Sequence, residues 1–134
     1  YHQIRETGRV RLFQSHRPDY GDGEQRRDFV YVKDCVDVMW WLMQNRDKNG
    51  IFNVGTGQSR TWNDLISAVF GAMGMEPQID YIPMPENLQA QYQYFTEAKM
   101  DKLRNLGCPV CFKPLEETVR DYVVNYLGAQ EAHL

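Results

Sequence analysis

Side chains that bind anionic oxygens gather in two short stretches near the start of the chain, at Ser15, His16 and Arg17 and again at Arg27. All of them donate hydrogen bonds to oxyanions, and a guanidinium group can hold a phosphate through two parallel hydrogen bonds. His16 suits such a contact better than it suits the role of a lone base. The local sequence leaves a second interpretation of Arg27 open, a surface ion pair with Asp28 worth about 0–1 kcal/mol.

Tyr92 and Tyr94 lie in an irregular polar segment and combine an aromatic ring with a hydroxyl group. This combination is expected around a sugar or a nucleobase. The alternative is that both rings simply cover the core, and for Tyr94 the two interpretations are evenly matched. Taken with the donors of the first stretches, the tyrosines predict a surface that recognises an anionic sugar nucleotide.

Gly55 and Gly57 lie between a predicted strand and a predicted helix, as at the start of a dinucleotide-binding unit. The third position of that motif needs a small residue for close helix–strand packing, and Arg60 occupies it. Asp80 falls inside its predicted strand, whereas a ribose would sit at the carboxyl end. A tight turn is therefore favoured over a cofactor site.

Cys108 and Cys111 form a lone CxxC pair that follows a predicted helix C-terminus. A zinc site needs a second ligand pair, and a reactive thiol needs a helix N-terminus, so we expect no metal and no redox role here. No Gly-x-Ser-x-Gly nucleophile motif is present. The odd number of cysteines, 3 in all, favours a reducing, cytoplasmic location.

Residues 29–32 form a short apolar run that predicts a strand buried on both faces. Such a strand would fix Arg27 and its neighbours at the mouth of a buried element. Asp34 is expected to cap a helix that runs to about residue 46. That helix is apolar on nearly all sides, which predicts packing on more than one face.

The remaining pattern alternates strands with helices and predicts an α/β fold with short strands and about four helices. Residues 1–6 have the character of a last helical turn closed by Gly8. Thr61 and Asp64 form a capping box, Thr96 is expected to cap a further helix, and residues 129–134 are expected to fray. The predicted strands span residues 9–13, 51–54 and 79–82, and the further predicted helices span residues 61–73, 96–106 and 114–127.

The size and charge of the chain exclude several classes of protein. Its 134 residues, 43% of them hydrophobic, fit one domain with its own core. A net charge of -3 argues against a general nucleic-acid binder. No apolar run is long enough to span a membrane, so we expect no membrane association.

Residues 27–34, 51–57, 81–85, 92–96 and 112–115 are similar to the sequence signatures of a known family. Through them, and over nearly its whole length, the chain resembles the C-terminal part of the ADP-L-glycero-D-manno-heptose 6-epimerases, a family of extended short-chain dehydrogenases/reductases with a Rossmann-like fold. Residues 27–34 and 51–57 are similar to signatures shared across that extended class. Residues 81–85, 92–96 and 112–115 are similar to the heptose epimerases in particular. The resemblance implies that residues 1–134 are a C-terminal substrate-binding fragment, without the N-terminal NADP-binding domain.

The resemblance also implies a site and a reaction. The full enzyme would interconvert two ADP-heptose epimers by NADP-dependent oxidation and reduction at C6″, which supplies a precursor of the lipopolysaccharide core. NAD is possible as the cofactor, and no catalytic or cofactor-binding residue is expected in this chain. The residues expected to bind the nucleotide sugar are Phe13, Gln14, Ser15, His16, Arg27 and Tyr92.

Two other functions stay open on the sequence alone. One is another nucleotide-sugar enzyme of the same class, such as a UDP-sugar 4-epimerase or a dehydratase. The other is a non-catalytic binding module. If the chain is a fragment, apolar strand faces that would lie against the missing domain predict that the isolated chain forms dimers or higher oligomers.

Overall fold

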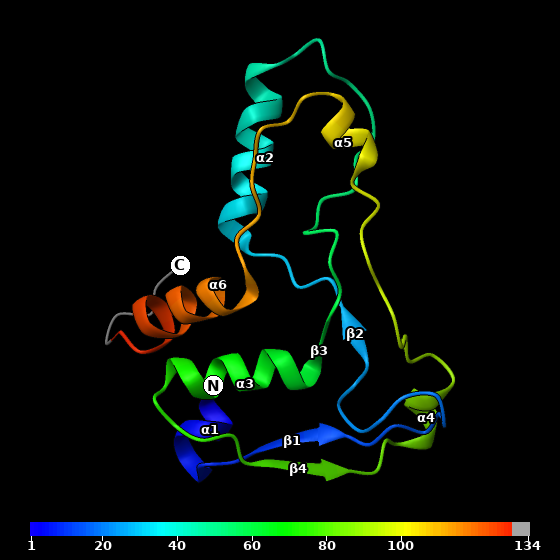
Figure 1. Ribbon diagram of the computed structural model, residues 1–134, viewed down its shortest axis with the longest axis vertical. Helices are drawn as coiled ribbons and strands as arrows, with labels where there is room; N and C mark the ends of the chain where they lie inside the picture. Colours follow the sequence, from blue (N-terminus) through cyan, green and yellow to red (C-terminus); the bar gives the residue numbers. More distant parts are fainter. Residues whose placement is uncertain (130–134) are drawn as a thin grey trace.

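The computed structural model describes residues 1–129, and its elements are helices and short strands (Figure 1). This order confirms the α/β fold class. In chain order the elements are α1 (His2–Thr7), β1 (Val10–Phe13), β2 (Arg26–Arg27), α2 (Val32–Gln44), β3 (Arg60–Thr61), α3 (Trp62–Ala72), β4 (Ile79–Ile82), α4 (Glu86–Gln89), α5 (Asp101–Asn105), α6 (Leu115–Tyr122) and the π-helical turn η1 (Val123–Leu127).

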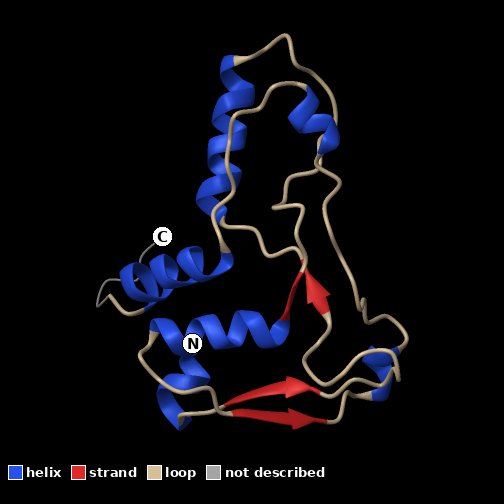
Figure 2. Cartoon of the chain, viewed as in Figure 1, coloured by secondary structure: helices blue, strands red, loops and turns tan. Residues whose placement is uncertain are grey.

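A parallel pair of strands, β1 and β4, forms the base of the molecule, with both arrows pointing the same way in Figure 2. Gly8 ends α1 with a φ of 70°, a left-handed conformation that favours glycine, and lets the chain turn directly into β1. The core of this part contains Ile4, Val10 and Phe70, so it joins α1, β1 and α3. The predicted helix end and strand are therefore confirmed.

The capping box predicted for α3 is present. The Thr61 side chain accepts a hydrogen bond from the backbone N–H of Asp64 at 2.9 Å, and Asp64 accepts one from the backbone N–H of Thr61 at 3.0 Å. This reciprocal pairing satisfies two of the free donors at the start of a helix. One side of α3 faces the β1–β4 pair, and α6 packs against the other (Figure 1).

A second core lies between α2 and α5 in the upper part of Figure 1. It is built on Val38, Met100 and Leu103, which are at most 3% exposed. Phe52 and Val54 pack against it, although the segment that carries them forms no strand. The strand predicted over residues 51–54 is therefore wrong: two of its side chains join the core from an irregular segment, and Ile51 is 89% exposed.

The strand predicted over residues 29–32 is also wrong. Strand pairing ends at Arg27 because the partner, β3, is only two residues long. The chain then crosses to the start of α2 without regular structure, and Phe29 packs edge-on against Trp62 with ring centroids 5.2 Å apart. Val30 is 40% exposed, so the run is not buried on both faces.

The helix α2 begins three residues earlier than expected, with Tyr31 rather than Asp34 at the N-cap. Asp34 is instead buried in the first turn, where its carboxylate accepts a hydrogen bond from the backbone N–H of Lys113 at 3.1 Å. The helix is not packed on more than one face. Its outer side exposes Val32, Val36, Met39, Trp40 and Met43, each at least 50% accessible.

Two smaller expectations differ from the structure. Thr96 does not cap a helix, because α5 starts only at Asp101 with Met100 as its N-cap. The intervening residues are held in place by backbone hydrogen bonds to the Asp28 carboxylate and to β2.

The expected fraying of the C-terminal tail, residues 129–134, concerns residues outside the described range, apart from Ala129. Within residues 1–129, no helix has the length and apolar character that crossing a membrane requires.

Candidate functional site

The long loop after β1 meets the segment after α4 at one end of the molecule (Figure 1, lower right). Tyr94 lies at this meeting point and is only 5% exposed. Its hydroxyl oxygen is 2.9 Å from the backbone nitrogen of His16, 2.8 Å from His16 Nδ1 and 3.3 Å from Ser15 Oγ. One buried hydroxyl group therefore joins both predicted donors of the loop.

The rest of the loop is held by its own side chains. Asp22 accepts a hydrogen bond from the backbone N–H of Ser15 at 2.7 Å. The guanidinium group of Arg17 donates to Asp19 at 2.9 Å and lies over the rings of Tyr20 and Tyr94, at 5.3 and 5.0 Å from their centroids. Such cation–π contacts stabilise a guanidinium over an aromatic face. Arg17 is thus engaged inside the loop.

Arg27 lies beside this loop, on the strand β2. Its guanidinium carbon is 5.3 Å from the centre of the Tyr92 ring, and that ring packs edge-on against Phe13 at 6.5 Å and Tyr94 at 5.6 Å. One N–H of Arg27 donates to the backbone carbonyl of Arg26 at 2.8 Å. No carboxylate of the described residues forms a salt bridge with Arg27, so its other N–H groups are available to a ligand.

Five of the six predicted binding residues therefore form one chain of contacts, namely Phe13, Ser15, His16, Arg27 and Tyr92, with Tyr94 at its centre. Gln14 is not brought into this chain of contacts: its backbone N–H donates to the carbonyl of Ile82 at 2.8 Å and extends the pairing of β1 with β4.

A pocket of about 310 Å³ opens beside this group of residues. Phe13 and Tyr92 line it together with Gln25 and Trp62. The indole N–H of Trp62 is buried and has no hydrogen-bond partner among residues 1–129. Aromatic walls with a few polar groups are typical of a site for a flat, partly polar ligand.

Asp28 follows Arg27 directly but faces the other way, into a separate network. Its carboxylate accepts hydrogen bonds from the backbone N–H and the hydroxyl group of Thr56 at 2.8 and 2.6 Å, from the backbone N–H of Gly57 at 2.9 Å and from that of Ala98 at 3.0 Å. Among the described residues, no Arg27–Asp28 salt bridge is present. The surface ion pair that the sequence left open is therefore wrong.

The network sets the ionisation of Asp28. Burial is the largest single influence on the carboxyl group and raises its pKa, but the hydrogen bonds from Thr56, Ala98 and Gly57 outweigh it. The pKa of Asp28 therefore lies below its ordinary value.

The turn at Gly55 and Gly57 has room for no side chain beside Asp28. A side chain at Gly55 would collide with the Asp28 carboxylate, since a Cβ there would lie 2.6 Å from Asp28 Oδ2. The Gly–Thr–Gly sequence thus serves a tight turn around Asp28.

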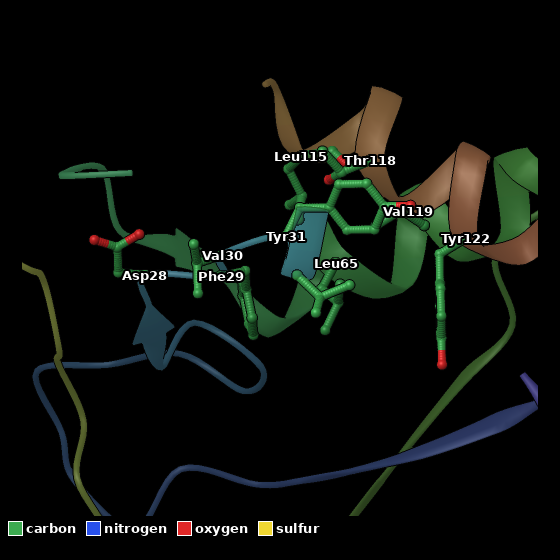
Figure 3. Close-up of a pocket in the computed structure, with 10 residues that line it drawn as sticks. Asp28, Phe29, Val30, Tyr31, Leu65, Leu115, Thr118, Val119 and Tyr122 are labelled. Atoms are coloured by element: carbon green, nitrogen blue, oxygen red, sulfur yellow. The ribbon is translucent and has the colours of Figure 1, made fainter. Parts of the chain in front are cut away.

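A second pocket, of about 520 Å³, lies between residues 28–32, α3 and α6 (Figure 3). Asp28 is at one end and Tyr122 at the other, with Tyr31 and Leu65 between them. The lining is largely apolar, and the one carboxylate in it is already satisfied by the hydrogen bonds described above. Its chemistry fits packing against an apolar surface better than recognition of an anion.

The fold is that of a part of the nucleotide-sugar epimerases. A structure of the ADP-L-glycero-D-manno-heptose-6-epimerase of Helicobacter pylori superposes with a TM-score of 0.71 at 27% identity, over 92% of this chain and 34% of that one. The UDP-glucose 4-epimerase of Thermus thermophilus gives a TM-score of 0.71 at 26% identity, over 90% of this chain and 36% of that one.

The sequence pattern of the NAD dependent epimerase/dehydratase family matches residues 5–55 of this chain. It is 62% identical, over all its 134 residues, to the ADP-L-glycero-D-manno-heptose-6-epimerase of Nitratidesulfovibrio vulgaris strain Hildenborough. The chain spans 42% of that relative.

Three residues of the site were missed or undervalued by sequence reasoning. Tyr94 was left evenly matched between a binding role and covering the core, although its spacing of two from Tyr92 was a usable signal, because residues two apart in an extended segment point to the same side. Trp62 was assigned only to the apolar face of α3. Asp28 gave no local signal at all, because its partners lie 28 to 70 positions away in the sequence.

Proposed function

We propose that this chain is the substrate-binding part of an ADP-L-glycero-D-manno-heptose 6-epimerase. Residues 1–134 bind the nucleotide sugar, and an NADP-binding domain elsewhere in the protein carries out oxidation and reduction at C6″. The support is the 62% identity to a protein of that name, together with a site whose chemistry fits an anionic, ring-bearing ligand.

The observation that carries the proposal is the environment of Arg27. A guanidinium group is held over an aromatic ring, without a carboxylate partner among the described residues, next to the His16 and Ser15 donors. In this arrangement Arg27 binds the diphosphate through its free N–H groups. The exposed His16 ring adds a donor on the same side, Ser15 holds the loop that carries it, and the rings of Phe13 and Tyr92 border the adjacent pocket.

A nicotinamide cofactor does not fit the glycine turn of this chain. In a dinucleotide site the backbone N–H groups of such a turn bind the pyrophosphate. Here the N–H of Gly57 donates to Asp28, and the carboxylate would repel a phosphate at this position. The cofactor, when bound elsewhere in the protein, supplies the hydride transfer. This chain binds and orients the sugar nucleotide for that step.

The test uses the intact protein, NADP and ADP-D-glycero-D-manno-heptose, with inversion at C6″ followed by NMR. We expect conversion to the L-glycero epimer by the intact protein and none above background by the 134-residue chain alone. Absence of conversion by the intact protein would contradict the proposed activity. Turnover by the isolated chain would show that catalytic groups are present in it.

A second candidate is a UDP-sugar 4-epimerase, favoured by the equal TM-score to the Thermus thermophilus enzyme. The two candidate enzymes differ in the nucleobase of the substrate, adenine or uracil, and in the sugar carbon whose configuration is inverted. Inversion at C4 of a UDP-hexose by the intact protein, without inversion at C6″ of an ADP-heptose, would establish this alternative.

A further inference from the structure

Tyr94 connects the two groups of donors in the site. Its backbone carbonyl accepts a hydrogen bond from the N–H of Arg26 at 2.8 Å, which fixes it to the strand that carries Arg27. Its hydroxyl group reaches the loop after β1, at Ser15 and His16. The length of one tyrosine therefore sets the separation between Arg27 and the loop donors.

The contacts of the hydroxyl group also determine how the His16 ring is used. A hydroxyl group has one proton to donate and two lone pairs to accept with. The backbone N–H of His16 can only donate, so the Tyr94 oxygen accepts from it at 2.9 Å. Ser15 donates its single proton to the carbonyl of Arg17, where the distance is 2.8 Å against 3.3 Å to Tyr94.

Two groups could then take the Tyr94 proton, Ser15 Oγ at 3.3 Å and His16 Nδ1 at 2.8 Å, and the shorter distance favours Nδ1 as the acceptor. An imidazole that accepts at Nδ1 carries its proton at Nε2 when the ring is neutral. No hydrogen bond to Nε2 is formed by any residue from 1 to 129, and the His16 side chain is exposed. The ring therefore presents Nε2–H outward as a fixed donor.

We propose that Tyr94 is a positioning residue, which holds His16 in the Nε2–H tautomer so that this group donates to an anionic oxygen of the ligand bound by Arg27. The identity of that ligand as a nucleotide sugar rests on the proposed function, whereas the tautomer and its dependence on Tyr94 do not.

The variant Tyr94→Phe removes only the hydroxyl group and keeps the buried ring. Tyr20→Phe is the matched control: Tyr20 packs against Tyr94 at 4.9 Å between ring centroids, and its hydroxyl group forms no hydrogen bond with the described part of the chain. In the intact protein we expect Tyr94→Phe to weaken ADP-heptose binding about five- to tenfold, the effect of one lost hydrogen bond. We expect Tyr20→Phe to stay within about twofold.

The second readout is the ¹⁵N NMR spectrum of the His16 ring, recorded without ligand. We expect the Nε2–H pattern in the wild type and in Tyr20→Phe, and a mixture of tautomers in Tyr94→Phe. An Nδ1–H pattern in the wild type would overturn the proposal, even if Tyr94→Phe did not fold. Equal affinities of Tyr94→Phe and Tyr20→Phe for ADP-heptose would overturn it as well.

The two readouts separate this inference from the proposed function. If the wild type has the Nε2–H pattern, and Tyr94→Phe loses it, but ADP-heptose does not bind, the positioning role stands and the proposed ligand is wrong. If ADP-heptose binds and the ring pattern is the same in all three proteins, the function stands and the positioning role is wrong.

Discussion

Arg27 and Asp28 are neighbours in the sequence, yet their side chains belong to two regions with opposite characters. Around Asp28, every strong acceptor is used, and the carboxylate joins β2 to the turn at Thr56 and to Ala98. Around Arg27, most donors are unused, and the guanidinium group rests on the ring of Tyr92. We call these the scaffold region and the binding region.

Under the proposed function, the difference separates a charge that stabilises the fold, on Asp28, from a charge that is held for a ligand, on Arg27. A carboxylate whose hydrogen bonds are all internal gains nothing from a partner outside the protein. A guanidinium group that is fixed in orientation but not neutralised retains its affinity for anions. The pair therefore allows effects on stability and on ligand binding to be measured at adjacent positions.

The largest effect is expected in the scaffold region. Asp28→Ala removes the acceptor of three backbone N–H groups, on Thr56, Gly57 and Ala98. Each donor left without its partner costs about 1 kcal/mol, so we expect the free energy of unfolding to fall by about 3 kcal/mol in a urea titration. The control Asp37→Ala removes an exposed carboxylate from α2 and should change the free energy of unfolding by less than about 0.5 kcal/mol. Equal losses would show that Asp28 is not a scaffold residue.

In the binding region we expect the reverse pattern. Arg27→Ala should weaken binding of ADP-heptose to the intact protein about ten- to a hundredfold, because hydrogen bonds between charged groups contribute about 1.5–3 kcal/mol. The free energy of unfolding should change by less than about 0.5 kcal/mol. Arg26→Ala, on the same strand with an exposed side chain, serves as the control for affinity, measured by calorimetry. A loss of stability in Arg27→Ala as large as that in Asp28→Ala would remove the distinction between the regions.

The exposed face of α2 differs from both regions because its apolar side chains are not covered by any other part of residues 1–129. Trp40 is 58% and Met43 63% exposed, and burying such side chains drives association. We therefore expect the isolated 134-residue chain to self-associate, and Trp40→Glu to raise the dissociation constant of the dimer about tenfold. Gln58→Glu adds the same charge at an exposed position outside α2 and should have little effect. Light scattering that shows a wild-type monomer at high concentration would contradict this prediction.

The smallest effect concerns pH. Because the pKa of Asp28 is lowered in the folded state, its stabilising contribution is complete above the unfolded carboxyl value of about 4 and is lost as the pH falls below it. The free energy of unfolding should therefore decrease more steeply with acid in the wild type than in Asp28→Asn. Arg27→Ala should keep the wild-type slope. Parallel curves for the wild type and Asp28→Asn would contradict the assigned pKa shift.

Local patterns predicted the elements whose cause is local. The turn at Gly8, the Thr61–Asp64 capping box and the helix predicted over residues 61–73 all depend on residues a few positions apart. Predictions that depended on distant partners were wrong. The run at residues 29–32 was assigned to a buried strand, but β2 has only a two-residue partner.

The site shows the same division. Residue types alone marked Ser15, His16, Arg27 and Tyr92 as donors and rings that suit a nucleotide sugar. The contact that joins them runs through Tyr94, 78 positions from His16 in the sequence, and only the fold reveals it.

The most direct test of the account is a calorimetric titration of the intact protein with ADP-heptose and, separately, with UDP-glucose. We predict saturable binding of ADP-heptose with one molecule per chain, at least about tenfold tighter than that of UDP-glucose. No binding of ADP-heptose, or tighter binding of UDP-glucose, would contradict the claim that this chain binds an ADP-linked sugar through Arg27 and its neighbours.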